Sequence, residues 1–369
     1  MQTKSTRIAI GHAADRVIDD AETDETVAQL HYDITSFGAD YDVDGLVKRM
    51  KKDEILVPPF QRGYVWNLKE ASRFVESLLL GLPVPGIFLA KEASSNKFLV
   101  IDGQQRLRTL QFFYEGFFDP KPIDKAHKIF KLINVQKQYE GRTYKALEEK
   151  DRIQLDNSII HATIIKQDSP PGENTSIFHV FERLNTGGLK LAAQEVRVAT
   201  YHGTLMDLIR NLNEYSHWRS IYGKPSPRSK DQELILRFLA LYADNEKYEK
   251  PMSEFLNKFS GRHRDATSQF LEQCRNTFTS TIELVSRSLG SQAFRPERSL
   301  NAAVFDSVMV GVAKRLELGP IKKIAKISTA YDELLKNSKY MDAISRATSD
   351  ELNVSKRLQE AISTFKRVE

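Results

Sequence analysis

The residues best suited to chemistry follow a short apolar run near residue 100. The run Phe98–Ile101 is typical of a buried strand, and Asp102 and Gly103 end it before a helical pattern begins. Glycine permits a tight turn, and the free N–H groups and positive dipole end of the following helix form an anion site. Arg106 adds a guanidinium that can bind a phosphate through two hydrogen bonds. The spacing therefore predicts an anion-binding turn at residues 102–106.

Each polar side chain of this turn suggests a chemical role. Asp102 could hold a divalent cation or orient Arg106. Gln104 and Gln105 carry neutral amides that donate and accept hydrogen bonds, which suits the orientation of a water molecule or a phosphate oxygen. The simpler explanation is that Asp102 only caps the helix, but capping requires neither two glutamines nor an arginine.

Two further segments carry polar side chains at expected turns. In the first, Gln61 and Arg62 lie among aromatic residues in a loop that begins with proline, where charged side chains are uncommon without a ligand or a partner. In the second, a helical pattern ends at Gly187 and Gly188, a turn whose backbone can approach a ligand closely. A packed aromatic loop and an ordinary helix end are the simpler explanations of these two segments.

The elements that must position these segments alternate between strand and helix up to about residue 200. Strands are expected at Ile55–Val57, Gly86–Lys91, Lys97–Ile101, Ile129–Val135 and Ile159–Ile165. Helices are expected at Gly45–Lys52 with Asp44 as its cap, at Leu68–Leu80 with a capping box of Asn67 and Glu70, after Gly103, and at Asn174–Leu184.

From about residue 205 onward the apolar spacing is helical. The segments are Leu205–Asn213, Asp231–Tyr242, Ala266–Leu289, Leu300–Leu316 and Leu352–Phe365. We therefore expect a flexible acidic tail at residues 1–31, an α/β domain at residues 32–200 and an all-α domain at residues 201–369. Cys274 falls in one of the helical segments and is expected in its core.

The composition indicates a globular protein of mildly basic charge. The chain has 369 residues, a formal net charge of +5 and one cysteine, which excludes an internal disulfide framework and a Cys-rich metal cluster. No apolar run reaches the ~18 residues of a spanning helix, and the N-terminus lacks the apolar core of a secretory signal, so a cytoplasmic protein is expected. Residues 201–369 contain 27 Lys and Arg against 21 Asp and Glu, which could attract nucleic acid or simply be a solvated helical surface.

Three motifs make the sequence resemble a known family. They are Phe60-Gln61-Arg62 with Tyr64-Val65-Trp66, Ile101-Asp102-Gly103-Gln104-Gln105-Arg106-Leu107 with Thr109-Leu110, and Phe181-Glu182-Arg183-Leu184-Asn185-Thr186-Gly187-Gly188 with Gln194-Glu195 and Arg197. In this order, over about residues 40–200, they resemble the DGQQR domain family, the ParB-like N-terminal domain of GmrSD-type modification-dependent restriction enzymes and of SspE-like defence effectors. The resemblance implies a ParB/sulfiredoxin-like fold that binds and hydrolyses a nucleoside triphosphate, coupled in restriction and defence members to the sensing of modified DNA.

The resemblance also implies roles for individual residues. Asp102, Gly103, Gln104, Gln105 and Arg106 would form the nucleotide-phosphate and catalytic segment. The nucleotide pocket would further be lined by Gln61, Arg62, Glu182, Arg183, Asn185, Gly187 and Gly188. Mg²⁺ would accompany the ATP or GTP, with Asp102 as its ligand or as the residue that orients Arg106, while Gln104 or Gln105 positions the attacking water.

The chain departs from the larger members of this family, which continue into a His-Asn-His nuclease domain. Beyond residue 200 the sequence has only His202, His217 and His263, none in the setting of such a metal site, so we expect no DNA cleavage by this chain alone. We expect a nucleotide-hydrolysing component of a bacterial anti-phage defence system, whose helical domain contacts double-stranded DNA or a separately encoded nuclease, with no membrane partner.

Two other functions stay open at this point. One is a non-catalytic ParB-like DNA-binding or antitoxin-like regulatory module, and the other is a nuclease built on the ParB-like core alone. The preferred nucleotide base, the DNA signal, the identity of a partner and the formation of a homo-oligomer are not decided by the sequence.

Overall fold

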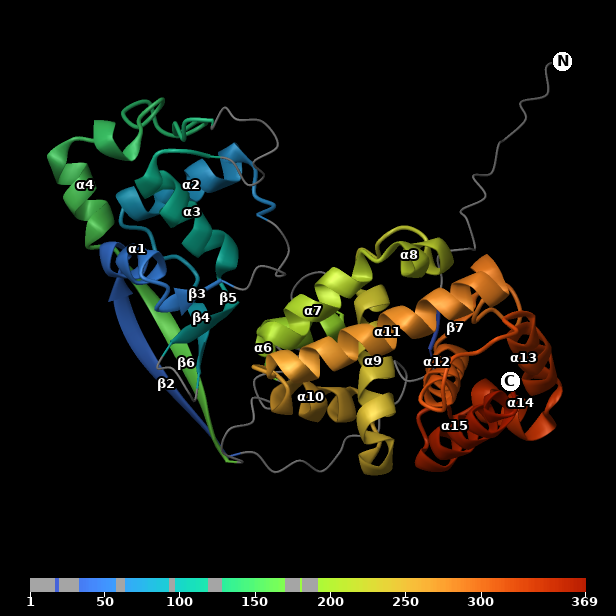
Figure 1. Cartoon of the computed structure of the whole chain (residues 1–369). Coiled ribbons are helices and arrows are strands. Elements are labelled where there is room, and N and C mark those ends of the chain that lie inside the picture. The colour runs from blue at the N-terminus through green and yellow to red at the C-terminus, as the bar shows by residue number, and fades with distance from the viewer. Residues whose placement is uncertain are drawn as a thin grey trace, which may run out of the picture. The chain divides into compact units, whose positions relative to one another are not determined.

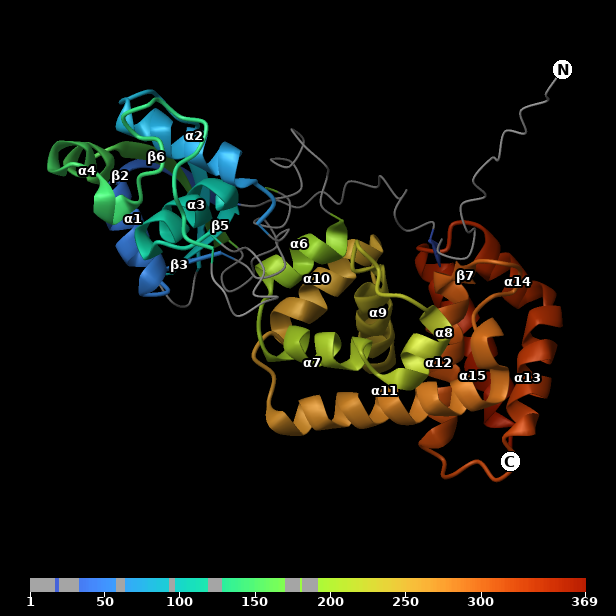
Figure 2. The same cartoon turned by 90° about the horizontal axis from the view of Figure 1, so that it is seen from above.

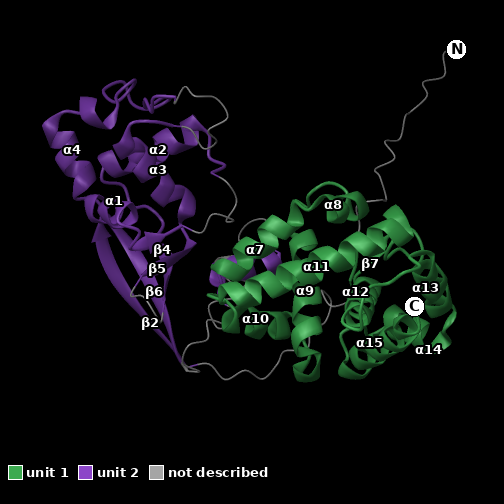
Figure 3. Cartoon of the chain, in the orientation of Figure 1, with its two compact units in different colours: residues 1–30, 203–369 green, residues 31–202 purple. Residues whose placement is uncertain are grey.

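The protein consists of two compact units. A computed structural model describes residues 17–19, 33–57, 64–92, 97–118, 128–169, 180 and 192–369. One unit comprises residues 31–202, and the other comprises residues 1–30 together with residues 203–369 (Figure 3). The first unit is α/β and the second is rich in helices, which confirms the predicted succession of an α/β part and a helical part.

A mixed five-stranded sheet forms the centre of the α/β unit (Figure 1). Its strands lie in the order β2 (Asp33–Asp42), β6 (Ile159–Ser169), β4 (Ile87–Lys91), β5 (Phe98–Asp102) and β3 (Ile55–Leu56). β2 with β6 and β4 with β5 are antiparallel, whereas β4 with β6 and β3 with β5 are parallel. The strand that ends at Asp102 is therefore an inner strand, paired on both sides.

Helices cover both faces of this sheet. On one face lie α1 (Val43–Lys51), α2 (Leu68–Leu79), α3 (Gln104–Glu115) and α4 (Glu149–Asp156), together with a short 3₁₀ turn at Tyr144–Ala146. Their core includes Leu89 of β4, Val100 of β5 and Leu107 of α3. On the other face Ile101 packs with Val196 of α6 (Ala193–Thr200). Burial on both faces explains why β4 and β5 are continuous apolar runs in the sequence.

The helical unit is built around a buried central helix. Its helices are α7 (Thr204–Asn213), α8 (Ser216–Tyr222), α9 (Lys230–Asp244), α10 (Met252–Arg262), α11 (Ser268–Leu289), α12 (Ala302–Leu316), α13 (Ala325–Lys336), α14 (Ser338–Ser345) and α15 (Glu351–Lys366), with 3₁₀ turns at Asn245–Lys247 and Gly290–Gln292. α12 is buried along most of its length between α9, α11 and α15, and α11 lies along α7 and α8 (Figure 2). Among the helices that the structure describes, none combines the length and the apolar character needed to cross a bilayer.

An N-terminal segment is part of the helical unit. Strand β1 (Val17–Ile18) pairs in parallel with β7 (Leu300–Asn301), just before α12. Residues 17–19 lie within the stretch for which the sequence predicts a flexible tail, and at these three residues the structure instead shows contacts with a folded unit. Asp19 explains this order, because its carboxylate accepts hydrogen bonds from Lys230 and Arg237.

The predicted elements agree with the observed ones where local signals are strong. The capping box of Asn67 and Glu70 is present at the start of α2, with Glu70 N donating to Asn67 Oδ1 at 3.0 Å. The predicted N-cap of α1 is wrong by two residues, since Asp42 and not Asp44 accepts a hydrogen bond from Gly45 N at 2.6 Å. Asp44 instead lies in the first turn of α1 and pairs with Lys48.

Other expectations fail for a physical reason. The stretch Ile129–Val135 is an irregular segment and not a strand. The N–H group of Phe130 donates to the carbonyl of Gly116, and that of Leu132 donates to the carbonyl of Arg142, so the segment forms no continuous ladder. Its apolar residues Phe130 and Leu132 are buried nonetheless. The sequence analysis does not predict β2, an edge strand that is mostly exposed. The helix predicted at Asn174–Leu184 lies outside the described residues, apart from Val180.

The buried position of Cys274 on α11 predicts low reactivity. Burial raises the pKa of its thiol to about 11, so roughly one thiol in a thousand is ionised at about pH 8. We expect Ellman's reagent to react with the native chain at this pH far more slowly than with the chain in guanidinium chloride. Free glutathione under the same conditions gives the reference rate, and a native rate close to that of glutathione would show that Cys274 is not buried in solution.

Candidate functional site

The predicted anion-binding turn joins β5 to α3 and depends on Gly103. This residue has φ +98° and is the N-cap of α3. A Cβ atom built on it would lie 2.4 Å from Cγ2 of Ile87, at the start of β4. Only glycine therefore fits, since both the backbone conformation and the close approach to β4 exclude a side chain. Because Gly103 has no side chain to act as a cap, the first N–H groups of α3 receive no acceptor from their cap residue.

Arg106 is held in a fixed orientation beside this turn. Its Nη2 donates to Asp102 Oδ2 at 2.8 Å and to the carbonyl of Gly86 at 2.9 Å. The side chain of Arg106 is 15% exposed and that of Asp102 is 56% exposed. Arg106 Nε is buried and has no hydrogen-bond partner among the residues that the structure describes. The guanidinium thus retains donor capacity, and Asp102 pairs with Arg106 rather than serving as the cap.

Gln105 connects α3 to the last residues of the aromatic loop, Tyr64–Trp66. Its Oε1 accepts from the backbone N–H groups of Val65 at 3.0 Å and Trp66 at 3.3 Å. One turn further along α3, Thr109 Oγ1 lies 2.7 Å from the hydroxyl of Tyr64 and donates to the carbonyl of Gln105 at 2.7 Å. Burial raises the pKa of Tyr64 to about 12, so this hydroxyl stays protonated. Residues 64–66 are therefore fastened to the first two turns of α3.

The remaining motif residues that the structure describes lie on α3 and α6. Gln104 is buried in the first turn of α3. Glu195 Oε2 accepts from Ala192 N at 2.6 Å and so satisfies the start of α6, while Arg197 is fully buried and donates to Gln194 Oε1 at 2.6 Å. These contacts are the ordinary stabilising contacts of a helix.

The structure brings together part of the predicted site. Asp102, Gly103, Gln104, Gln105 and Arg106 form one continuous turn at the end of an inner strand. The other predicted residues, Gln61, Arg62, Glu182, Arg183, Asn185, Gly187 and Gly188, lie outside the described residues. Their roles stay predictions.

Two contacts at the turn are not evident from the sequence. The carbonyl of Gly86 fixes Arg106 from a position 20 residues earlier in the chain, and Ile87 provides the surface on which Gly103 packs. No local spacing signals a contact between segments this far apart. The only sequence signal near these contacts is Gly86 at the start of a predicted strand, since glycine is typical of places where two backbone segments approach closely.

Metal ligands at the turn are few. Asp102 supplies one carboxylate, and within the described part of the chain no three or more His, Cys, Asp or Glu side chains gather as a metal site. Mg²⁺ in nucleotide sites is commonly held by one or two carboxylates together with the phosphates of the substrate. Asp102 therefore fits such an ion only in the company of a bound phosphate.

Comparison with known proteins identifies the segment that contains this turn. Residues 43–202 match the family model described as GmrSD restriction endonuclease, N-terminal domain. A search of curated proteins gives no match to the chain. The matched segment covers the sheet from β3 to β6 and the β5–α3 turn, and ends with α6.

The close approach at Gly103 predicts an unusually costly substitution. Gly116, at the other end of α3, also has a positive φ of +87°, but a Cβ there would meet no atom within 4 Å. We expect Gly116→Ala to cost about 1–2 kcal/mol from backbone strain alone, and Gly103→Ala to cost roughly 1–3 kcal/mol more from overpacking against Ile87. Amide hydrogen exchange in α3 and β5 measures the loss of stability in both variants. Equal losses would show that the side chain of Ile87 moves aside at little cost.

The contacts of Gln105 predict that it positions the Tyr64–Trp66 segment. Gln105→Ala removes the acceptor of two N–H groups, so the amides of Val65 and Trp66 should exchange faster with solvent, by roughly tenfold for about 1.4 kcal/mol lost. Gln105→Glu keeps an oxygen acceptor, now of a carboxylate, at the same distance along the side chain and should keep their exchange slow. Unchanged exchange in Gln105→Ala would mean that Tyr64 and Thr109 alone hold the segment.

Proposed function

We propose, from the match of residues 43–202 to the family model of GmrSD restriction endonuclease N-terminal domains, that the chain is a component of a restriction-type defence system that binds and hydrolyses a nucleoside triphosphate. The family assignment supports the defence role. The nucleotide chemistry is supported by the arrangement of the β5–α3 turn.

The orientation of Arg106 carries this proposal. A guanidinium with spare donors lies beside the start of α3, where the cap residue leaves the first N–H groups without a side-chain acceptor. Positive charge and a helix N-terminus together favour phosphate. Phosphoryl transfer requires positioning and charge stabilisation more than covalent chemistry, and both are available at this turn.

The contacts divide the roles among the polar residues. Arg106 would bind phosphate oxygens, and Asp102 orients Arg106 through their ion pair. Gln104 or Gln105 would orient the attacking water, and Gln105 also uses its Oε1 to hold Val65 and Trp66. Gln61, Arg62, Glu182, Arg183, Asn185, Gly187 and Gly188 are proposed to contact the nucleotide on the basis of their motifs.

Mg²⁺ is proposed to accompany the nucleotide, whether ATP or GTP. When bound, the ion neutralises charge on the phosphates and fixes their geometry. Asp102 would hold it, since its carboxylate is more than half exposed while one oxygen remains bonded to Arg106. The helical unit, in which basic residues exceed acidic ones, would contact double-stranded DNA or a partner nuclease.

One observation favours a second candidate function. Asp102 is the only carboxylate that the described residues provide at the turn, and it is already paired with Arg106. A site of this kind could bind nucleotide without turning it over. The chain would then act as a nucleotide-dependent regulatory module, with its enzyme in a partner protein.

The proposal is tested by measuring release of phosphate from each of the four nucleoside triphosphates, with Mg²⁺ and with or without plain and modified DNA. Asp102→Ala and Arg106→Ala should each lower kcat/KM by roughly a hundredfold or more, since Arg106→Ala removes positive charge at the transferred phosphoryl group and Asp102→Ala removes the residue that orients Arg106 and would hold Mg²⁺. Arg49→Ala is the matched control, because Arg49 is an exposed arginine of the same unit paired with Glu54.

The outcomes separate the two functions. Turnover that both site variants abolish and Arg49→Ala preserves establishes a triphosphatase. Binding by calorimetry without turnover establishes the regulatory module. Absence of both binding and turnover in a folded chain removes the nucleotide site.

A further inference from the structure

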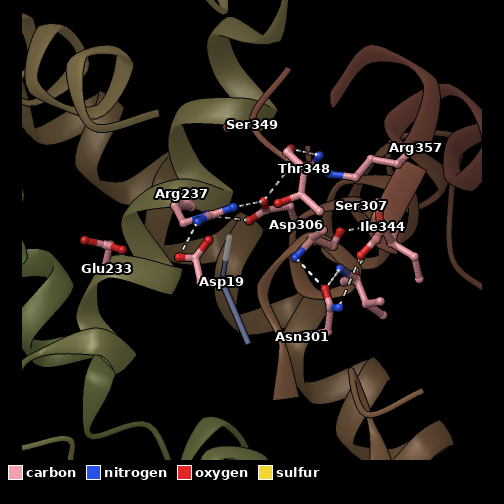
Figure 4. A network of polar contacts seen from close by, with 12 residues as sticks. Asp19, Glu233, Arg237, Asn301, Asp306, Ser307, Ile344, Thr348, Ser349 and Arg357 are labelled. Carbon is pink, nitrogen blue, oxygen red and sulfur yellow. Dashed lines mark hydrogen bonds and ion pairs between the residues drawn. The ribbon is translucent and has the colours of Figure 1, made fainter. Parts of the chain in front are cut away.

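A network of buried charges lies in the helical unit and includes a residue of the N-terminal segment. Figure 4 shows Arg237 of α9 between Asp306 of α12 and Asp19, with Arg357 of α15 on the far side of Asp306. The side chains of Arg237, Asp306 and Arg357 are at most 1% exposed, and that of Asp19 is 2% exposed. The network thus joins three helices of the core to a segment from the other end of the chain.

Arg237 is held by the core independently of Asp19. Its Nε donates to Asp306 Oδ1 at 3.2 Å and its Nη2 to Asp306 Oδ2 at 2.6 Å, a paired contact that fixes the guanidinium plane. Arg357 Nη2 donates to the same Asp306 Oδ2 at 3.1 Å. The remaining edge of the Arg237 guanidinium, Nη1, points to Asp19.

Two cations converge on one oxygen of Asp19. Arg237 Nη1 donates to Asp19 Oδ2 at 2.8 Å, and Lys230 Nζ donates to the same oxygen at 2.6 Å. Lys230 is held from the other side by Glu233 at 2.8 Å. Burial alone would lower the pKa of Arg237 and of Lys230, but the neighbouring carboxylates raise both above their usual values, so both cations stay charged beside Asp19. Such convergence of fixed donors is the geometry of an anion site.

Two buried cations share the carboxylate of Asp19. In these contacts the cations are Lys230, Arg237 and Arg357, and the anions are Asp19, Asp306 and Glu233. Replacing Asp19 by a neutral residue would remove the anion that Lys230 and Arg237 both contact. Burying a charge is costly unless the charge is paired, so this position favours an anion.

The segment that supplies this anion is short. We call Val17–Asp19 the strap. Its strand β1 is two residues long, and Ile18 is 42% exposed. A cavity of about 220 Å³ borders it, lined by Ile18, Ser299, Asn301, Thr348 and other residues. Ordering three residues costs roughly 1–2 kcal/mol each, so conformational entropy opposes the docking of the strap.

The charge pattern of the sequence matches this arrangement. The acidic residues before β2 are Asp15, Asp19, Asp20, Glu22, Asp24 and Glu25. The helical domain after residue 200 has an excess of basic residues, including Lys224, Arg228 and Lys230 just before and at the start of α9. Asp19, which docks on this domain, carries the negative charge that a basic domain would attract in a polyanion.

We propose that Lys230 and Arg237 form a phosphate-binding site in the helical unit and that the strap closes it by placing Asp19 where a phosphate group would bind. The ligand is a phosphate, either free in solution or part of a nucleic-acid backbone. The strap is then an autoinhibitory contact: phosphate binding displaces it, and its docking weakens phosphate binding. This site is separate from the triphosphate site proposed above and does not depend on it.

The substitution Asp19→Asn tests this competition directly. It keeps the shape of the side chain but removes the charge that competes with phosphate. We expect binding of inorganic phosphate or of a short labelled DNA duplex at low salt to become roughly tenfold tighter, the factor expected if the strap is docked about nine tenths of the time. Adding Lys230→Gln to Asp19→Asn should remove the gain. Asp244→Asn is the control, since Asp244 is a largely buried aspartate of the same unit, paired with Lys247 and Arg262.

The two ligands distinguish the source of the phosphate. Tighter binding of both ligands identifies a general phosphate site, and tighter binding of the duplex alone identifies a nucleic-acid backbone. If folded Asp19→Asn binds neither ligand more tightly than the unsubstituted chain, Asp19 is only a structural ion pair and the proposal is wrong.

A second measurement keeps the test decisive if Asp19→Asn fails to fold. In the unsubstituted chain, the amides of Ile18 and Asp19 should exchange faster with solvent when phosphate or duplex is present at saturation. Unchanged exchange under these conditions would overturn the proposal. This measurement requires no hydrolysis, so its result is distinct from the fate of the proposed triphosphatase activity.

Discussion

The contact between Gly103 and Ile87 is the constraint on which the candidate site depends. It brings the end of β5 so close to the start of β4 that no side chain fits between them. The same approach places Arg106 within 2.9 Å of the Gly86 carbonyl, at the edge of the same strand. The orientation of the guanidinium and the direction of α3 therefore follow from one backbone conformation. Gln105 then extends this fixed geometry to Val65 and Trp66.

The helical unit is specified by a different kind of interaction. Its central helix α12 is apolar on nearly all sides, but at its first turns Asp306 receives Arg237 and Arg357 from two neighbouring helices. Buried ion pairs add little net stability compared with apolar packing, yet breaking one costs about 3–5 kcal/mol because a charge is left unpaired. The network thus selects one arrangement of α9, α12 and α15. The α/β unit fixes its site by backbone geometry, whereas the helical unit fixes its core by charge pairing.

Local signals in the sequence predict much of this structure. The Asn67–Glu70 capping box, the apolar run before Asp102 and the 3.6-residue periods after residue 205 all depend on neighbours within a few positions, and the corresponding elements are present. The turn at residues 102–106 is predicted for the same reason. Contacts between distant segments leave no such signal: the Gly86 carbonyl beside Arg106 is one case, and Asp19 is another. In the sequence Asp19 is not distinguished from the other acidic residues around it, because its partners lie 211 and 218 residues away.

The position of the strap in the chain gives its docking a consequence beyond the helical unit. Residues 1–30 belong to the helical unit and residues 31–202 to the α/β unit, so the chain passes between the units twice. When Asp19 is bound, the first of these passages starts from a fixed point shortly before β2. When Asp19 is released, this point is no longer fixed to the helical unit. Coupling between two sites is reciprocal in free energy. Any ligand of the α/β unit that changes the freedom of the chain before β2 would therefore shift the docking of Asp19, and displacement of Asp19 would shift the affinity for that ligand by the same factor.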